Sequence, residues 1–157
     1  GHSAPPLVRV WVVTPNSAVR IGDDEMSERL EVLFPGGKRI DIQVGGFTIA
    51  TDQPVKVGGD ASAPQPFSLF LASMAGCAGI YALNFCQSRE ISAQGMTLSM
   101  LWERESTQPI QAKVRFQLKL PDGFPDKYRD SIVRAMDLCA VKKHMENPPE
   151  FITEVLD

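Results

Sequence analysis

One stretch constrains the fold more than any other. From Phe67 to about Arg89 the sequence contains no proline and is apolar almost throughout. This composition predicts a helix that is hydrophobic on most of its circumference, and such helices are usually buried. At the helical rise per residue it would be about 35 Å long. That length is large for a chain of 157 residues, so we expect the helix to form the central spine of the fold or to lie in an extended dimer interface.

Short strands are predicted before this helix, because β-branched and alternating apolar residues recur there. The predicted strands run from Leu7 to Val13, Arg29 to Phe34, Arg39 to Val44 and Phe47 to Thr51. The Gly45–Gly46 pair predicts a tight hairpin, because two-residue turns need positive φ angles. We therefore expect an antiparallel meander, followed by a loop from Asp52 to Pro66 that is rich in Pro, Gly, Asp and Ser.

Two further strands and two helices are predicted after the long helix. The strands cover residues 97–106 and 113–121, with Pro109 between them; one helix opens at Pro125 and Asp126, and a short one covers Ala140 to Met145. This order is typical of an α+β fold rather than of βαβ repeats. We expect one domain over residues 7–157. The first six residues, GHSAPP, look like the remnant of a tag.

The composition excludes several classes of function. With 43% hydrophobic and 22% charged residues and a net charge of -3, the chain is ordinary for a soluble globular protein, and we expect no nucleic-acid partner. No apolar stretch is judged long enough to span a bilayer, and no leader is recognised, so we expect a cytoplasmic protein without a membrane partner. Three unevenly spaced cysteines do not form a disulfide framework. The sequence has no C-x-x-C motif, and its two histidines are His2 and His144. We therefore expect no metal and no cofactor.

Two cysteines lie within the predicted long helix. Cys77 and Cys86 are nine residues apart, about half a turn in angle, so they face opposite sides and cannot pair. Gly76 and Gly79 flank Cys77, and glycine weakens a helix interior, so either close helix packing or room for a small substrate is needed to explain them. We expect Cys86 to be a packing residue.

The third cysteine, Cys139, lies where two predicted helices meet. As the cap of the short helix, it would be close to free N–H groups that favour a thiolate, and Lys142 and Lys143 would add positive potential. An inert buried thiol explains the same features. The residues alone therefore leave open both a dithiol redox site and simple packing.

Two segments resemble a known family. The stretch GGDASAPQPFSLFLASMAGCAGIYALNFCQSREI resembles the glycine-rich loop, proline and cysteine-bearing helix of the OsmC/Ohr family. The stretch LPDGFPDKYRDSIVRAMDLCAVKKHM resembles its second cysteine segment, usually a C-P-V-x-x type sequence before a short helix. The resemblance covers roughly Arg29 to Phe151, with the two cysteine motifs in the family's order.

The resemblance implies an OsmC-like fold, in which antiparallel sheets surround long central helices in an intertwined homodimer. It also implies a peroxidase for organic hydroperoxides, an antioxidant oxidoreductase of the oxidative stress response. By motif, Cys77 would be the peroxidatic cysteine that becomes a sulfenic acid. Cys139 would resolve it as a disulfide, which an external dithiol would reduce.

The sequence departs from the family pattern at one position. Where the family has the Glu of an N-P-E motif, this chain has Phe67, which cannot orient an arginine. The family arginine usually follows a Gly-Gly pair, and in this chain the residues after such a pair are Lys38 and Arg39. We choose Arg39 as the third catalytic residue, because the planar guanidinium group with its several N–H donors suits a thiolate or a peroxide. Arg20 and Arg29 remain candidates for the cation, and Asp52 and Asp60 for the missing carboxylate, although a loop role is the simpler explanation for both aspartates.

The leading hypothesis is a thiol-dependent peroxidase that uses Cys77 and Cys139. Apolar residues predicted to line the approach favour organic peroxides over hydrogen peroxide: Phe67, Phe70, Leu71 and Met74. The alternative is an OsmC-fold protein without peroxidase turnover that binds an apolar small molecule or acts in other thiol or sulfur chemistry. A third reading is a structural dimeric domain with buried cysteines.

Overall fold

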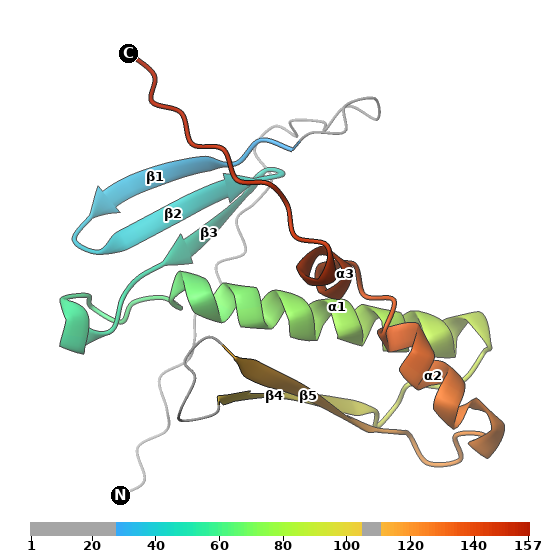
Figure 1. The fold of residues 1–157 in the computed structure, drawn as a ribbon. Coiled ribbons are helices and arrows are strands. Elements are labelled where there is room, and N and C mark those ends of the chain that lie inside the picture. The colour runs from blue at the N-terminus through green and yellow to red at the C-terminus, as the bar shows by residue number, and fades with distance from the viewer. Residues whose placement is uncertain (1–27, 105–110) are drawn as a thin grey trace, which may run out of the picture. The chain divides into compact units, whose positions relative to one another are not determined.

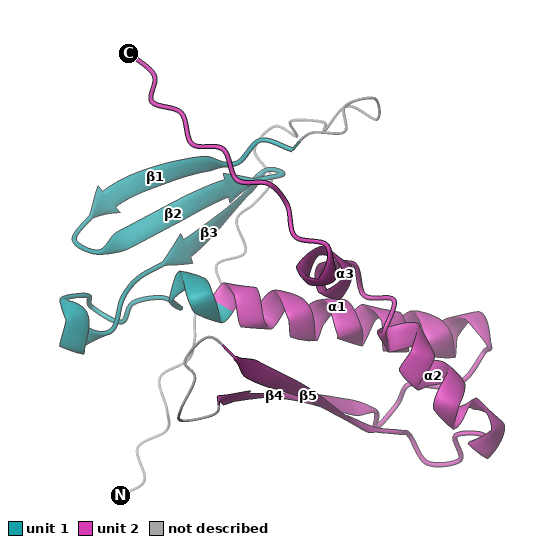
Figure 2. Ribbon diagram, viewed as in Figure 1, with its two compact units in different colours: residues 1–68 teal, residues 69–157 magenta. Residues whose placement is uncertain are grey.

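The computed structural model describes residues 28–104 and 111–157. The chain divides into two compact units, residues 1–68 and 69–157 (Figure 2). The strand predicted from Leu7 to Val13 lies outside the described residues, as does Arg20. The expectation of a single domain over residues 7–157 stays a prediction.

The first unit contains a three-stranded antiparallel sheet. Its strands are β1 (Glu31–Gly36), β2 (Arg39–Val44) and β3 (Phe47–Thr51), joined in sequence order (Figure 1). The predicted bounds of β2 and β3 are confirmed. So is the hairpin between them: Gly45 and Gly46 have φ angles of 54° and 81°, which a side chain would strain.

The first strand begins later than predicted. It starts at Glu31 rather than Arg29 and continues to Gly36, with a register shift between Leu33 and Gly36 where it pairs with β2. Such an irregularity inserts unpaired residues and bends the strand. Periodicity alone predicts that the strand ends at Phe34, because the Pro-Gly sequence that follows resembles a turn.

The second unit holds most of the long helix α1 (Pro66–Ser88), which begins at the predicted proline. It lies along a two-stranded antiparallel sheet of β4 (Thr97–Arg104) and β5 (Ala112–Lys119), as Figure 1 shows. A 3-10 turn, Asp126–Tyr128, precedes α2 (Arg129–Met136), and α3 is Ala140–Glu146. The predicted α+β class is therefore confirmed.

A small core joins α1 to α2 and the loop before it. Its buried members are Ala78, Ala82, Phe85, Cys86, Phe124, Ile132 and Met136. The α1 residues among them follow the four-residue spacing of one helix face. Phe85 packs edge-on against Tyr128, with ring centroids 5.9 Å apart, and the guanidinium of Arg89 lies 3.7 Å from the Phe85 ring centroid. These contacts fix the end of α1 against α2.

One chain by itself buries only part of α1, and the predicted burial of this helix in a dimer interface stays a prediction. Within its most apolar 18 residues, 28% are buried, and Ile80 is 47% exposed. By length and composition this helix could also cross a membrane, so the expectation that no apolar stretch is long enough is wrong. One such helix is weak evidence for a membrane, because the core helix of a soluble protein meets the same criteria.

Candidate functional site

The three cysteines are all free thiols in distinct surroundings. Cys77 lies in the middle of α1 and is partly exposed, whereas Cys139 and Cys86 are 3% and 0% exposed. Cys86 belongs to the hydrophobic core, as predicted for a packing residue. Burial raises the pKa of its thiol, and the opposing charge of Arg89 does not offset this. Cys86 is therefore an unreactive thiol.

Cys139 caps α3, as the sequence predicts. Its backbone is non-helical, with φ -47° and ψ 126°, and its carbonyl accepts the first helical hydrogen bond from the Lys143 N–H at 3.1 Å. Its own N–H donates to the carbonyl of Met136 at 3.2 Å, which ties the junction to the end of α2. The N–H groups in the first turn of α3 have no acceptor within that helix, so they are free to bind another group.

The surroundings of Cys77 favour the charged form of its thiol. Its burial acts to raise its pKa, but hydrogen bonds from the Cys139 thiol and from the backbone N–H groups of Val141 and Ala140 act the other way, and the pKa of Cys77 is lowered. Hydrogen bonds donated to a thiolate favour the charged form. Cys77 is thus the sulfur of the pair that loses its proton first.

Cys139 shows the opposite shift. Burial raises the pKa of the Cys139 thiol, and its hydrogen bond to the Cys77 sulfur raises it further, against weaker hydrogen bonds from the N–H groups of Lys142 and Val141. The two thiols therefore have pKa values shifted in opposite directions, lowered at Cys77 and raised at Cys139. A reactive nucleophile and a nearby protonated partner can together form a disulfide.

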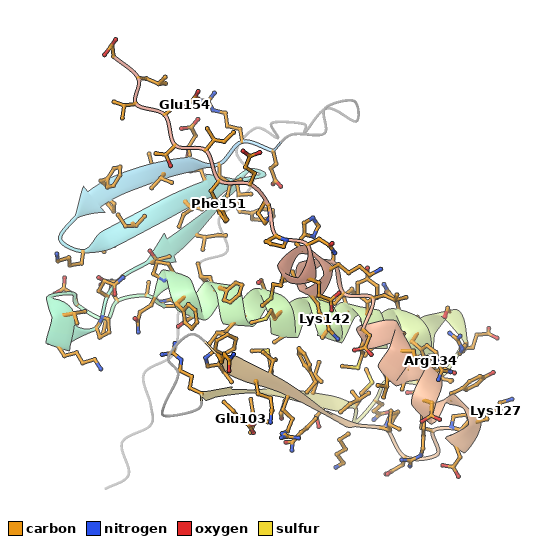
Figure 3. All side chains as sticks on the ribbon, viewed as in Figure 1. Glu103, Lys127, Arg134, Lys142, Phe151 and Glu154 are labelled. Carbon is orange, nitrogen blue, oxygen red and sulfur yellow. The ribbon has the colours of Figure 1, made fainter. Side chains whose placement is uncertain are left out.

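Lys142 contributes less positive potential than the sequence suggests. Its Nζ lies 2.7 Å from Oδ1 of Asp137, an ion pair that partly neutralises it; Figure 3 labels Lys142 on α3. Sequence reasoning considered the lysines and not the aspartate that precedes the cap. The groups that lower the pKa of Cys77 are instead the Cys139 thiol and the backbone N–H groups of Val141 and Ala140, and residue types do not reveal the backbone groups. The signal that could have located them is the position of Cys139 as a helix cap.

A cavity of about 590 Å³ adjoins Cys139 within the second unit. Its apolar wall comes from α1, β5, α2 and α3, and the Asp137–Lys142 ion pair also borders it. The apolar lining residues are Met74, Ala78, Val114, Phe116, Leu118, Val133, Met136 and Met145. Apart from Met74, none of these had been singled out in the sequence as a site residue. The flexible methionine side chains suit an apolar ligand of variable shape.

The two glycines beside Cys77 do not serve close packing within the described chain. A Cβ at Gly76 would meet no other element of the described residues within 4 Å, and one at Gly79 would lie 3.9 Å from a Leu98 methyl. Packing against the chain's own sheet therefore does not explain Gly76. Room for a substrate, or packing against a second copy, remains as the explanation.

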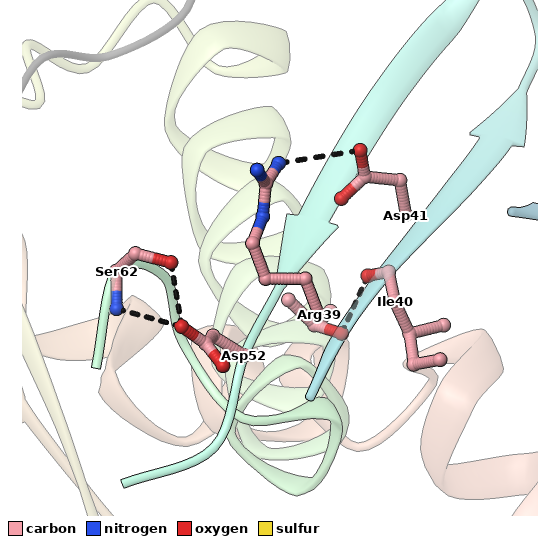
Figure 4. Close-up of polar contacts among 6 residues, drawn as sticks. Arg39, Ile40, Asp41, Asp52 and Ser62 are labelled. Atoms are coloured by element: carbon pink, nitrogen blue, oxygen red, sulfur yellow. Dashed lines mark hydrogen bonds and ion pairs between the residues drawn. The ribbon is translucent and has the colours of Figure 1, made fainter. Parts of the chain in front are cut away.

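Two of the described cation candidates, Arg29 and Arg39, form ion pairs within the first unit. Arg39 is paired with Asp41 at 3.5 Å on the same strand, and Arg29 is paired with Glu31 at 2.6 Å (Figure 4 draws the Arg39 pair). Lys38 lies in the turn between β1 and β2. The catalytic role of Arg39 stays a prediction, because the arginine and the cysteines belong to different units.

The Asp52 carboxylate forms its hydrogen bonds with residues of its own loop (Figure 4). It accepts hydrogen bonds from the Ser62 hydroxyl at 2.6 Å and from the backbone N–H groups of Gln53, Ser62 and Asp60. These bonds, led by Ser62, lower the pKa of Asp52 to about 2. The loop role expected for Asp52 is the one that the structure shows. Asp60 contributes its backbone N–H to the same network.

No group of three His, Cys, Asp or Glu residues suited to a metal ion occurs within residues 28–104 and 111–157. The pair of Cys77 and Cys139 can provide one thiolate and a second thiol that reacts with it after oxidation.

Comparison with solved structures shows the same fold in bacterial proteins. One from Psychrobacter arcticus, described as an osmotic stress induced and detoxification response protein, is 22% identical, with a TM-score of 0.62 over 76% of this chain and 88% of that chain. The organic hydroperoxide resistance protein OsmC from Legionella pneumophila is 16% identical, with a TM-score of 0.52 and the same coverage. A protein from Vibrio cholerae, described as an organic hydroperoxide resistance protein with captopril bound in one of its active sites, is 12% identical, with a TM-score of 0.54 over 80% of this chain and 90% of that chain.

No curated protein matches the sequence significantly. The profile of the OsmC-like protein family matches residues 59–154, which include both Cys77 and Cys139. This match covers more than half of the chain, and the similar structures share its fold. The chain therefore belongs to the OsmC-like protein family.

Proposed function

We propose that this protein is a thiol-dependent peroxidase that reduces organic hydroperoxides. The observation that carries the proposal is the unequal pair of thiols: the pKa of Cys77 is lowered, and that of its partner Cys139 is raised. Family membership and the similarity to proteins described as conferring hydroperoxide resistance support a role in redox chemistry and peroxide resistance.

The reaction begins at Cys77. Its thiolate attacks the terminal oxygen of the hydroperoxide, the O–O bond breaks, and the alkoxide leaves and takes up a proton to become an alcohol. Cys77 is then a sulfenic acid. Cys139 attacks that sulfur, the S–O bond breaks, and the hydroxide leaves as water with the proton from Cys139. An external dithiol reduces the resulting disulfide by two exchange steps and becomes a disulfide itself.

Arg39 enters the proposal as a cation for the peroxide or thiolate, as the family resemblance implies. Its ion pair with Asp41 gives that guanidinium a carboxylate partner, although Phe67 stands where the family has glutamate. Arg39→Gln should then lower peroxidase turnover without changing the hydrogen bonds around Cys77. Equal turnover in Arg39→Gln and the unmodified protein would remove Arg39 from the mechanism.

A titration of thiols tests the proposal. The reduced protein has three free thiols and is treated with one equivalent of cumene hydroperoxide. Two thiols should be lost, and mass spectrometry should find a Cys77–Cys139 disulfide with Cys86 unmodified. Cys77→Ser should abolish the loss, whereas Cys86→Ser, the matched control, should still lose two thiols. Unchanged thiol content at millimolar peroxide would refute the peroxidase. Hydrogen peroxide, run in parallel, tests the preference for organic substrates.

The cavity beside Cys139 favours a second candidate function, the binding of an apolar small molecule without turnover. About 590 Å³ is enough for a small ligand, and its wall is mostly apolar. This function predicts an apolar compound that copurifies with the protein, detected by mass spectrometry after organic extraction. It also predicts no loss of thiols with peroxide, so the same titration separates the two functions.

We also propose a homodimer in the cytoplasm. Large apolar side chains are exposed on the described chain, including Phe34 at 80% and Phe151 at 87%, the latter labelled on the C-terminal segment in Figure 3. A second copy that covers such surfaces would remove them from water, as stable oligomers do. Light scattering should give twice the monomer mass of 17.3 kDa. A mass of one chain at micromolar concentration would refute the dimer.

A further inference from the structure

The cavity beside Cys139 has two chemically different kinds of wall. Met74, Ala78 and Met136 line it and are 4%, 2% and 8% exposed, so part of the wall is apolar and shielded from water. Asp137 and Glu146 line the same cavity, and both are exposed. A cavity of about 590 Å³ with this division suits a ligand that is itself divided into an apolar chain and a polar head.

The charges that line the cavity do not cancel. The lining contains two carboxylates, those of Asp137 and Glu146, and one ammonium group, that of Lys142. The Lys142 Nζ lies 2.7 Å from Oδ1 of Asp137, so these two charges largely neutralise each other. Within residues 28–104 and 111–157, the Glu146 carboxylate forms no ion pair. One negative charge of the lining is therefore left without a counter-charge.

The groups around the cavity do not supply the missing cation. Lys143 and His144, the other basic residues of α3, do not belong to the lining. The last turn of α2 borders the cavity through Val133 and Met136, and the carbonyl groups at the C-terminus of a helix carry a partial negative charge. The cavity therefore combines an apolar interior with a net negative charge.

We propose that this cavity binds a small amphiphile with a cationic head, such as an alkylammonium ion. The alkyl chain lies against the apolar wall, where it is removed from water, and the ammonium group supplies the counter-charge of Glu146. A carboxylate with the same alkyl chain is disfavoured, because its head repels Glu146. The inference rests on the second candidate function, because it names the ligand class of the same cavity.

Isothermal titration calorimetry of the full reduced chain with three matched probes tests the proposal. Octylammonium, octanol and octanoate share one alkyl chain and differ in the charge of the head. At neutral pH and low salt, octylammonium should bind about threefold more tightly than octanol, and octanol about threefold more tightly than octanoate, as one partly solvated charge pair allows. Salt at about 1 M should remove most of these differences, because it screens exposed charges.

The substitution Glu146→Gln isolates the charge. It should bring the affinity for octylammonium close to that for octanol and leave the affinity for octanol unchanged. Glu150→Gln is the matched control, because Glu150 is also exposed but does not line the cavity, and it should keep the full preference. Circular dichroism checks that both variants fold. A preference for octylammonium that is unchanged in Glu146→Gln would overturn the proposal.

The octanol measurement separates this inference from the function on which it rests. If octanol and octanoate bind as tightly as octylammonium, the cavity binds apolar molecules, and the inference about the head group alone is wrong. If none of the three probes binds, both the inference and the second candidate function are wrong. None of these measurements uses a hydroperoxide, so their outcome does not depend on peroxidase activity.

Discussion

Cys77, in the middle of α1, and Cys139, the cap of α3, influence each other's ionisation in opposite directions: the pKa of Cys77 is lowered and that of Cys139 is raised. The two residues are about sixty residues apart in the sequence. Their thiols are therefore chemically unequal before any oxidant is present.

Cys77 should be alkylated first of the three cysteines. The pKa of Cys77 is lowered, whereas burial raises that of Cys86 and of Cys139, so Cys77 has the largest thiolate fraction at every pH below the ordinary thiol range. Substoichiometric iodoacetamide at mildly acid pH, followed by peptide mapping, should label Cys77 almost exclusively. Label on Cys86 at a comparable rate in the folded protein would contradict both its burial and its raised pKa.

Ile132 and Val133 provide a matched pair for the core. Ile132 is 0% exposed, and its neighbour Val133 is 54% exposed on the same helix. Ile132→Ala should lower the free energy of unfolding by about 2–5 kcal/mol, because the side chain leaves a cavity between α1 and α2. Val133→Ala should change it by about 0.5 kcal/mol or less. Urea unfolding measures both, and equal losses would contradict this description of the core.

Much of the fold could be predicted from local patterns. Three features depend on neighbours in the sequence and could therefore be predicted from it: the alternation in β2 and β3, the Gly45–Gly46 turn and the start of α1 at Pro66. The start of α2 was less clear. Pro125 and Asp126 open a 3-10 turn, and the α-helix begins at Arg129.

The chemistry of the site depends on contacts that residue types do not show. Ala140 gives no signal by its side chain, yet its backbone N–H contributes to the lowered pKa of Cys77; the resembled C-P-V segment has proline there, which lacks this donor. Asp137 is an ordinary helix-end aspartate in sequence, but it neutralises Lys142 in the fold. The partial burial of α1 depends on what covers the chain, and periodicity cannot distinguish a core from an interface.

Asp52 should make stability depend on pH below about 4. Its folded pKa of about 2 is below its ordinary value of 3.8, so its contribution is present above 3.8 and is lost as pH falls through 2. Asp52→Asn should be less stable at neutral pH, and the difference from the unmodified protein should shrink toward pH 2. Asp60→Asn, which keeps the Asp60 N–H bond to Asp52, is the control and should retain the effect. The prediction would be contradicted if urea unfolding showed a stability difference between Asp52→Asn and the unmodified protein that does not change with pH.

Gly59 and Gly76 should respond in opposite ways to alanine. A Cβ at Gly59 would lie 2.0 Å from the Gln53 carbonyl oxygen, so Gly59→Ala must displace backbone in the loop after β3 and should cost about 1–3 kcal/mol. Gly76 lies inside α1 with open space around it, so Gly76→Ala should stabilise the helix by up to about 1 kcal/mol. Thermal melting at low protein concentration measures both. Destabilisation by Gly76→Ala, accompanied by a smaller mass in light scattering, would contradict this prediction and would indicate instead that a second copy fills the space beside Cys77.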